Sequence, residues 1–209
     1  MKLFAAADIH GSQYRLNTIL KNIEKCSPDL VIICGDITQF GPGDVAKNFL
    51  NQIKVDTLAL PGNIDTQDVN KAISDSKATN INYKRIEKNG LTVVGIGGDL
   101  SDSLSEISIE YKNKKIPLIK TISKDTILVT HVPPYKTQDK VFFGHYSGNK
   151  ELRKIVDKYK PKLVLCGHIH EDPGVKMLEE TLVVNCSIGK RTEGAIIEIN
   201  DKIEVNILD

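Results

Sequence analysis

Residues that can bind a metal ion stand directly after five apolar segments of the chain. They are Asp8, His10, Asp36, Asn63, His131, His168 and His170. Four of the five histidines in the sequence belong to this set. Each residue alone has an ordinary explanation, because Asp and Asn form turns and a single histidine is more often a hydrogen-bonded structural residue. Together they favour one shared site.

The types of these side chains indicate which ions they could bind. Imidazole nitrogens suit zinc, iron or manganese, whereas carboxylate and amide oxygens suit harder ions such as manganese. Seven protein ligands are too many for one tetrahedral zinc ion. They suffice for two ions if one carboxylate bridges, and a pair of ions about 3.5–4 Å apart is a device for phosphoryl transfer. If the chain is still extended in Asp8-Ile9-His10 and His168-Ile169-His170, residues two apart point the same way.

The segments that carry these residues have the composition of buried strands. Apolar runs cover residues 2–7, 29–34, 57–60, 91–96, 126–130, 162–166, 181–185, 195–199 and 202–208. Continuous rather than alternating apolarity is typical of strands buried on both faces, as in α/β folds. Ligands bind at the carboxyl ends of the strands in open folds of this class. The sequence therefore predicts that the candidate ligands meet at one rim.

Helices and hairpins are expected between these strands. Ser12 precedes a helix with Leu16, Ile19, Leu20 and Ile23 at helical spacing, residues 149–159 form another, and a third begins near Asp44. Residues 66–80 are ambiguous. Asn89-Gly90 predicts a tight hairpin between residues 83–88 and 91–96, and Asn200-Asp201 indicates a second one less strongly. Crossovers combined with hairpins indicate mixed sheets.

Length and charge limit the possible classes of protein. The 209 residues fit one domain over residues 1–209. With 28 Lys and Arg against 27 Asp and Glu, the formal charge is +1, which supports neither nucleic acid nor an acidic membrane as a partner, although a local basic patch stays possible. The chain has no apolar window long enough for a signal peptide or a membrane span, and its four cysteines lack C-x-x-C spacing. We therefore expect a cytoplasmic protein with reduced cysteines.

The motifs D-I-H, G-D, G-N, H and G-H-I-H occur in this order over residues 8–170. This series resembles the calcineurin-like metallophosphoesterases, and residues 131–171 are similar to small prokaryotic single-domain members of phosphodiesterase type. The resemblance implies an α/β fold, a four-layer α-β-β-α sandwich with two mixed β-sheets flanked by helices. It also implies two divalent metal ions, with manganese as the first choice and iron, zinc or nickel as alternatives.

The resemblance further implies a role for each ligand. Asp8, His10 and His170 would hold the first ion, Asn63, His131 and His168 the second, and Asp36 would bridge both. A metal-bridging hydroxide would attack the phosphorus of a small-molecule phosphoester. In many family members a histidine follows the asparagine and protonates the leaving group, which is worth 10²–10⁴-fold in rate. Here that position is Ile64.

The expected function is therefore a dinuclear metal-dependent phosphoesterase that hydrolyses phosphodiesters rather than monoesters. The alternative is a metal-binding protein-interaction module on the same fold, with weak activity or none. A nuclease is less favoured, because the short chain lacks both the capping domain and the G-N-H motif of the repair exonucleases it would resemble. The sequence does not indicate the oligomeric state.

Several other polar residues have two interpretations each. His145 could replace the missing acid or contact substrate, which makes it a candidate catalytic residue together with Asn63; equally, it could be a loop histidine at the start of the helix near Asn149. We expect Asp65 to cap the helix that follows it. Glu171 is expected to be an exposed loop acid rather than a partner of a ligand histidine. Lys190 and Arg191 could attract phosphate, although such pairs are more often only solvated.

Overall fold

The strands and helices alternate along most of the chain. The computed structural model describes residues 1–100 and 104–209. Its elements are, in order, β1 (Lys2–Ala6), α1 (Gln13–Cys26), β2 (Leu30–Cys34), α2 (Gly43–Gln52), β3 (Thr57–Leu60), α3 (Gln67–Ser74), β4 (Thr79–Asn80), β5 (Lys84–Lys88), β6 (Leu91–Ile96), β7 (Ser108–Tyr111), β8 (Lys114–Pro117), the 3₁₀ helix η1 (Leu118–Thr121), β9 (Thr126–Thr130), the 3₁₀ helix η2 (Phe142–Gly144), α4 (Lys150–Tyr159), β10 (Leu163–Cys166), β11 (Gly174–Leu178), β12 (Thr181–Asn185), β13 (Gly194–Ile199) and β14 (Ile203–Leu208).

Two six-stranded mixed sheets contain most of these strands. One has the order β14-β13-β1-β2-β3-β4 and the other β11-β12-β10-β9-β6-β5. Strands β1–β4 are parallel in the first sheet, and β12, β10, β9 and β6 are parallel in the second. Strand β13 pairs antiparallel with β1, and the hairpin partners β14, β11 and β5 pair antiparallel at the edges. The mixed sheets and the hairpins β5–β6 and β13–β14 agree with the sequence, whereas the hairpin β11–β12 was not predicted.

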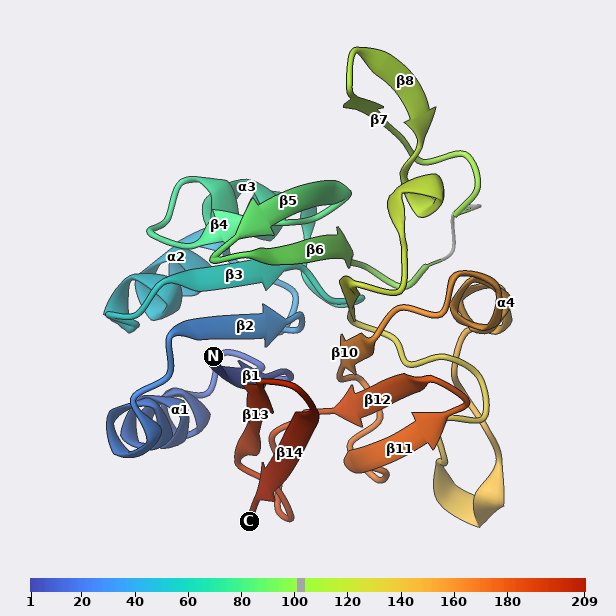
Figure 1. Cartoon of the computed structure of the whole chain (residues 1–209). Helices are drawn as coiled ribbons and strands as arrows, with labels where there is room; N and C mark the ends of the chain where they lie inside the picture. The colour runs from blue at the N-terminus through green and yellow to red at the C-terminus, as the bar shows by residue number, and fades with distance from the viewer. Residues whose placement is uncertain (101–103) are drawn as a thin grey trace.

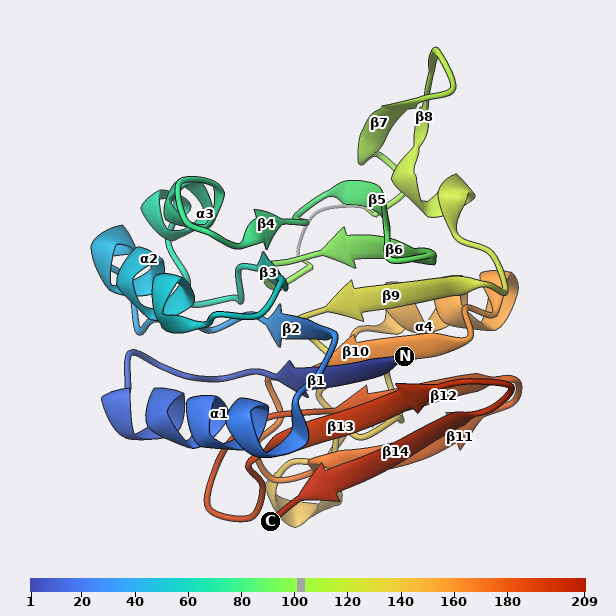
Figure 2. The same cartoon turned by 60° about the vertical axis from the view of Figure 1, so that its left-hand side comes forward.

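Three apolar cores separate four layers, because successive residues of a strand point to opposite faces. In β1, Leu3 and Ala5 face the core between the two sheets, while Phe4 and Ala6 face the core under the helices. Helices α1, α2 and α3 cover the first sheet, and α4 covers the second. Figures 1 and 2 show this order of layers, with α4 on the side opposite α1–α3. The expected α-β-β-α sandwich is confirmed.

The predicted helices form where the patterns placed them. The Ser12 side chain accepts a hydrogen bond from the backbone N–H of Arg15 at the start of α1. Asn149 caps α4 in the same way through the N–H of Leu152. Asn89 and Gly90 both have positive φ, as a type I′ hairpin turn requires. The strands β7 and β8 were not predicted, because their side chains are polar and largely exposed; they form a hairpin that projects from the sandwich (Figure 1).

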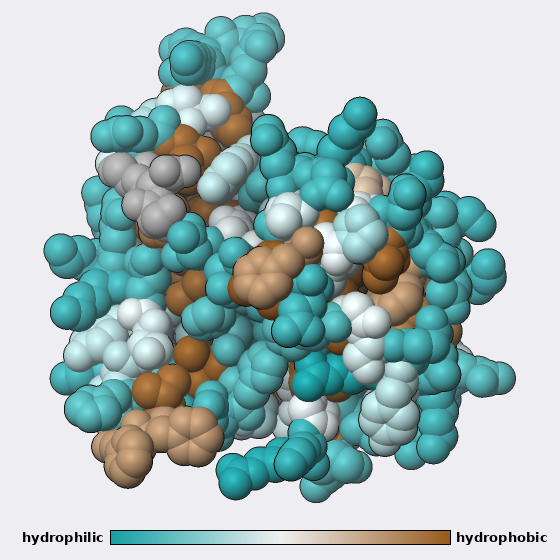
Figure 3. All heavy atoms as spheres, turned by 180° about the vertical axis from the view of Figure 1, so that it is seen from behind, coloured by the Kyte–Doolittle hydropathy of each residue, from teal (hydrophilic) through white to brown (hydrophobic). Residues whose placement is uncertain are grey.

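The surface and the cysteines agree with the composition. The face in Figure 3 is mostly hydrophilic. No helix among residues 1–100 and 104–209 is long and apolar enough to cross a membrane. Cys34, Cys166 and Cys186 are buried and all four cysteines are free thiols, so Cys34 and Cys166 act as the small core residues expected from their strands.

The core between the sheets should dominate stability. Leu165 of β10 is fully buried in it. We expect Leu165→Ala to lower the free energy of unfolding by about 2–5 kcal/mol, because the truncation leaves a cavity between two sheets that cannot close around it. Chemical denaturation measures this. Met177→Ala on the edge strand β11, where the side chain is 61% exposed, is the control and should stay within about 0.5 kcal/mol of the parent; equal effects would contradict the core assignment.

Candidate metal centre

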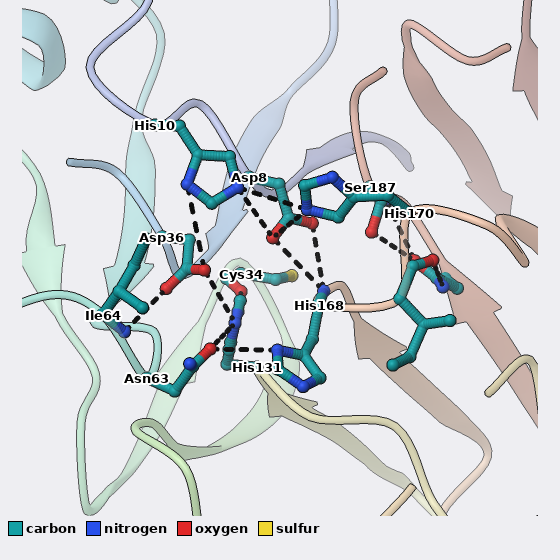
Figure 4. A network of polar contacts seen from close by, with 12 residues as sticks. Asp8, His10, Cys34, Asp36, Asn63, Ile64, His131, His168, His170 and Ser187 are labelled. Carbon is teal, nitrogen blue, oxygen red and sulfur yellow. Dashed lines mark hydrogen bonds and ion pairs between the residues drawn. The ribbon is translucent and has the colours of Figure 1, made fainter. Parts of the chain in front are cut away.

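The carboxyl ends of five strands meet where the two sheets adjoin. Strands β1, β2 and β3 come from the first sheet, and β9 and β10 come from the second. Backbone hydrogen bonds tie these ends together, from the N–H of Asp8 to the carbonyl of Gly35 (3.0 Å) and from the N–H of Gly167 to the carbonyl of His131 (2.8 Å). Figure 4 shows that the side chains leaving these ends point toward one another.

The first group of candidate ligands is Asp8, His10 and His170. The Nε2 atoms of the two histidines lie 3.2 Å apart. The Nε2 of His170 is also 3.2 Å from Oδ1 of Asp8, and the Nε2 of His10 is 3.8 Å from the same oxygen. Asp8 is fully buried, and its carboxylate accepts a hydrogen bond from the N–H of His168 (3.0 Å). That bond links the first group to the loop after β10.

The second group is Asp36, His131 and His168, with Asn63 beside it. The Oδ1 of Asn63 lies 2.9 Å from Nε2 of His131 and 2.9 Å from Nδ1 of His168. The Nδ1 of His131 lies 2.8 Å from the carbonyl oxygen of Cys34, so Nδ1–H donates to that oxygen and Nε2 is turned toward the site, where it can bind a metal ion once it has lost its proton. Oxygen and nitrogen ligand atoms therefore converge on one point.

Asp36 lies between the two groups. Its Oδ2 is 3.3 Å from Nε2 of His131 and 4.0 Å from Nδ1 of His10. Its other oxygen accepts a hydrogen bond from the N–H of Ile64 (3.2 Å). The carboxylate is therefore held in one orientation, with an oxygen turned toward ligands of both groups.

These separations fit metal coordination. Ligand atoms about 2.1 Å from one ion lie about 3.0–3.4 Å from each other in tetrahedral or octahedral geometry. The 3.2 Å between the histidine nitrogens of the first group and the 3.3 Å between Asp36 and His131 agree with that spacing. The donor set combines imidazole with oxygen ligands, which suits first-row divalent ions. The residues therefore form two candidate metal sites.

Turns rather than extended strands aim several of these ligands. Asp8 (φ 65°), His10 (φ 52°), Asp36 (φ 50°) and His168 (φ 71°) adopt the left-handed conformation. The condition for strand alternation to aim Asp8 and His10 the same way, an extended chain there, is therefore not met. The strand has already ended there, and a tight turn brings both side chains to the site. Such backbone costs about 1–3 kcal/mol per residue and is characteristic of functional sites.

Glycines allow the strand ends to approach this closely. A Cβ on Gly62 would lie 2.0 Å from Oδ1 of Asp36, and one on Gly35 would lie 2.7 Å from Nδ1 of His131. A Cβ on Gly167 would lie 2.3 Å from the Cβ of Ala7. The glycines directly before Asp36, Asn63 and His168 are thus a steric requirement of the site.

Asp65 has a different role from the expected helix cap. Thr66 occupies the N-cap position of α3. The carboxylate of Asp65 instead accepts hydrogen bonds from the backbone N–H groups of Ile37 (2.9 Å), Thr38 (2.8 Å) and Gly62 (2.9 Å), and from the Thr38 hydroxyl (2.8 Å). The prediction failed because local sequence could not show that the loop after β2 lies next to Asp65 and has backbone N–H groups that need an acceptor from another segment. Asp65 ties the Asp36 loop to the Asn63 loop.

Asp8 and the histidines of the centre have shifted pKa values. Burial opposes ionisation of Asp8, but its hydrogen bond to His170 and the charge of His131 outweigh burial and lower its pKa to about 2. Burial likewise opposes protonation of His131, but the hydrogen bond to Asp36 and the charges of Asp8 and Asp36 raise its pKa to about 9. Burial lowers the pKa of His168 and of His10. The two carboxylates therefore stabilise positive charge at His131, as they would stabilise that of a metal ion bound there.

The remaining candidates lie outside the two groups. Ile64 is half-buried and offers only its backbone N–H to Asp36. His145 is exposed on the loop between β9 and α4, and its carbonyl accepts a hydrogen bond from the N–H of Val141 (2.9 Å). Asn149, rather than His145, caps α4. Glu171 is exposed, as expected.

The calcineurin-like phosphoesterase family model matches residues 1–172, and the chain therefore belongs to this family. The region matched includes the whole set of candidate ligands. Membership makes the chain a metal-dependent phosphoester hydrolase by class, in agreement with the two candidate metal sites.

Individual relatives support this assignment. An uncharacterised protein of Methanocaldococcus jannaschii is 31% identical over 198 residues, which cover 90% of this chain and 88% of the relative. A probable glycerophosphodiester phosphodiesterase of Arcobacter nitrofigilis is 29% identical over 181 residues; the match covers 78% of this chain and 64% of that protein. The solved structure of an archaeal phosphodiesterase superposes with a TM-score of 0.60 at 16% identity over all of both chains, which shows a shared fold.

Gly62 offers a steric test of the centre. We expect Gly62→Ala to abolish binding of at least one metal ion, because the new methyl group displaces the Asp36 carboxylate. Metal content after dialysis against manganese, determined by mass spectrometry, measures this. Gly189→Ala is the control, since a Cβ there meets nothing within 4 Å. Full metal content in the Gly62 variant would contradict the proposed position of Asp36.

Proposed function

We propose that this chain is a two-metal phosphodiesterase that hydrolyses small-molecule phosphodiesters, with manganese as its first-choice metal. The observation that carries the proposal is the position of Asp36, whose Oδ2 is within 4.0 Å of a histidine nitrogen from each group. A carboxylate between two metal-ligand groups is what a bridged pair of ions requires. The similarity to a relative named a probable glycerophosphodiester phosphodiesterase also supports a diester as the substrate.

Each ligand would have a defined task. Asp8, His10 and His170 would hold the first ion and His131, His168 and Asn63 the second, with Asp36 shared. When bound, the two ions lower the pKa of a water molecule and stabilise negative charge on phosphoryl oxygens. The chain itself holds its ligands rigidly, through the Cys34 carbonyl behind His131 and the Asp65 carboxylate behind the Asp36 and Asn63 loops. This preorganisation reduces the reorganisation needed during reaction.

Ile64 favours substrates with good leaving groups. Its side chain cannot donate a proton, and the neighbouring carboxylate of Asp65 already accepts four hydrogen bonds. The site would then rely on metal ions for charge stabilisation and on the leaving group to depart unprotonated. Without another donor, diesters of acidic alcohols should react much faster than alkyl monoesters.

Asp36→Asn tests the two-metal proposal. On protein stripped of metal and reloaded with manganese, we expect bis-p-nitrophenyl phosphate to be hydrolysed faster than p-nitrophenyl phosphate. The variant should lose at least 10²-fold in kcat, on the order of what removal of one transition-state contact costs, because a neutral amide bridges two cations poorly. Initial rates measure this. Two bound metal ions without turnover of either ester would instead support the alternative of a metal-binding interaction module.

His145→Gln tests the substitute acid. If His145 protonates the leaving group or contacts substrate, the variant should lose turnover while keeping its metal. The loss of turnover should be largest for alkyl leaving groups, about 10²-fold or more, and smallest for p-nitrophenolate, which needs no proton. Rates for a series of leaving groups, with metal content measured in parallel, separate the two roles. Unchanged rates throughout would remove His145 from the mechanism.

A further inference from the structure

A hollow opens beside the first metal-ligand group. It has a volume of about 690 Å³, and His170 forms part of its wall. The other walls come from the first turn of α1 and from the loops that follow β9, β10 and β12. Since His170 belongs to both the candidate metal centre and this hollow, a substrate bound at the centre can extend into it.

Positive side chains dominate the lining of this hollow. Arg15, Lys140, Lys190 and Arg191 border it, against the two acids Glu171 and Asp172. The carboxylate of Asp172 already accepts a hydrogen bond from the backbone N–H of Lys140 (2.9 Å). Among the residues that the structure describes, none of the four cations forms an ion pair within 4.0 Å of a carboxylate. The hollow therefore carries a net positive charge within a chain whose total is only +1.

Arg15 connects the hollow to the metal centre. Its guanidinium donates a hydrogen bond to the carbonyl oxygen of Asp8, which fixes it beside the first ligand group. A fixed cation beside two cation sites is unfavourable without an anion, because like charges repel. Bound substrate can supply that anion.

Lys190 and Arg191 are held at the tip of a structured turn. Ile188 donates its N–H to the carbonyl of Ala7 (3.1 Å), and Gly189 donates to the carbonyl of Thr192 (3.0 Å). Both cations are exposed beyond these anchors. An adjoining hollow over α1 shares Arg15, Lys190 and Arg191, and is bordered also by Glu193 and Asp209. Of these two hollows, the one lined by His170 is therefore the one that continues into the candidate metal centre.

An aromatic loop borders the same hollow. Phe142 lines it and is 72% exposed, and Phe143 next to it is 99% exposed. In Figure 3 an apolar patch protrudes at the lower left, over the loop between β9 and α4. This loop gives the hollow a flat apolar edge beside its cations.

We propose that this hollow binds a second phosphate group of the substrate, so that the preferred phosphodiester carries a further phosphate near the scissile bond. Lys190 and Arg191 are the main contacts, and Arg15 lies between the two phosphates. The inference rests on the proposed function for the identity of the scissile group, and adds the class of substrate that the site selects.

Binding of matched ligand pairs tests the proposal. Calorimetry on manganese-loaded protein compares thymidine 3′,5′-bisphosphate with thymidine 5′-monophosphate, and propane-1,3-diol bisphosphate with its monophosphate. We expect the bisphosphate to bind about tenfold more tightly, the size that two partly exposed charge contacts can provide. The preference should shrink as salt is added, because exposed charges are screened.

Variants locate the preference. Lys190→Gln combined with Arg191→Gln should abolish it. The matched control, Lys54→Gln combined with Lys202→Gln, removes the same charge at the opposite end of the strands of the first sheet and should retain the preference. A preference for the bisphosphate in both ligand pairs indicates that the hollow recognises the phosphate group alone. A preference in the thymidine pair only indicates that the second phosphate must belong to a nucleotide. Equal binding of mono- and bisphosphates in both pairs, or a preference that survives the first double variant, would overturn the proposal.

Hydrolysis of bis-p-nitrophenyl phosphate, which has no second phosphate, separates this inference from the proposed function. Turnover of that ester without a preference for bisphosphates would support the proposed function and contradict the phosphate site in the hollow. A preference for bisphosphates without turnover would support the phosphate site and contradict the proposed function.

Discussion

The candidate centre depends on a backbone contact between the two sheets. Ala7, just beyond β1, donates its N–H to Cys186 and accepts from Ile188, both at 3.1 Å, and so pairs with the segment after β12 of the other sheet. This contact brings Asp8 against the loop after β10, where the N–H of His168 binds its carboxylate. Without it, the ligands from β1–β3 and those from β9 and β10 would belong to two separate edges. The metal centre is therefore a product of how the sheets join.

The edge where the sheets join is locally strained and held by buried polar contacts. Four of the candidate ligands adopt left-handed backbone, and three glycines lie so close to ligand atoms that a methyl group would clash with them. The Asp65 carboxylate, with four hydrogen bonds, offsets part of that cost by satisfying backbone N–H groups of two loops. Metal binding would offset more, because the buried carboxylates and imidazoles then share a cation. Stability and metal affinity should be coupled in this protein.

Two features beside the candidate centre, Ile64 and the charged hollow, bear on which substrates it would accept. In the proposed mechanism, Ile64 occupies the position from which an acid could protonate the leaving group, and this would limit the substrates to those with easily displaced leaving groups. The proposed phosphate site beside His170 would add selectivity through residues on three loops and on α1. Loops around a rigid scaffold commonly carry such specificity, because they vary without disturbing the core.

The sequence by itself determined the buried strands, the main helices and the ligand set, but not the short or polar strands β4, β7, β8 and β11. Continuous apolar runs and residues of one chemistry at their ends are local signals, and the family motifs span residues 8–170. Only the tertiary structure decided what Asp65 binds, how Asp8 and His10 are aimed, and that Lys190 and Arg191 lie beside His170. Those facts depend on contacts between segments far apart in the chain, such as Ile37 with Asp65 and Arg15 with Asp8. A local pattern indicates which groups a residue offers, whereas packing between sheets decides which partners it meets.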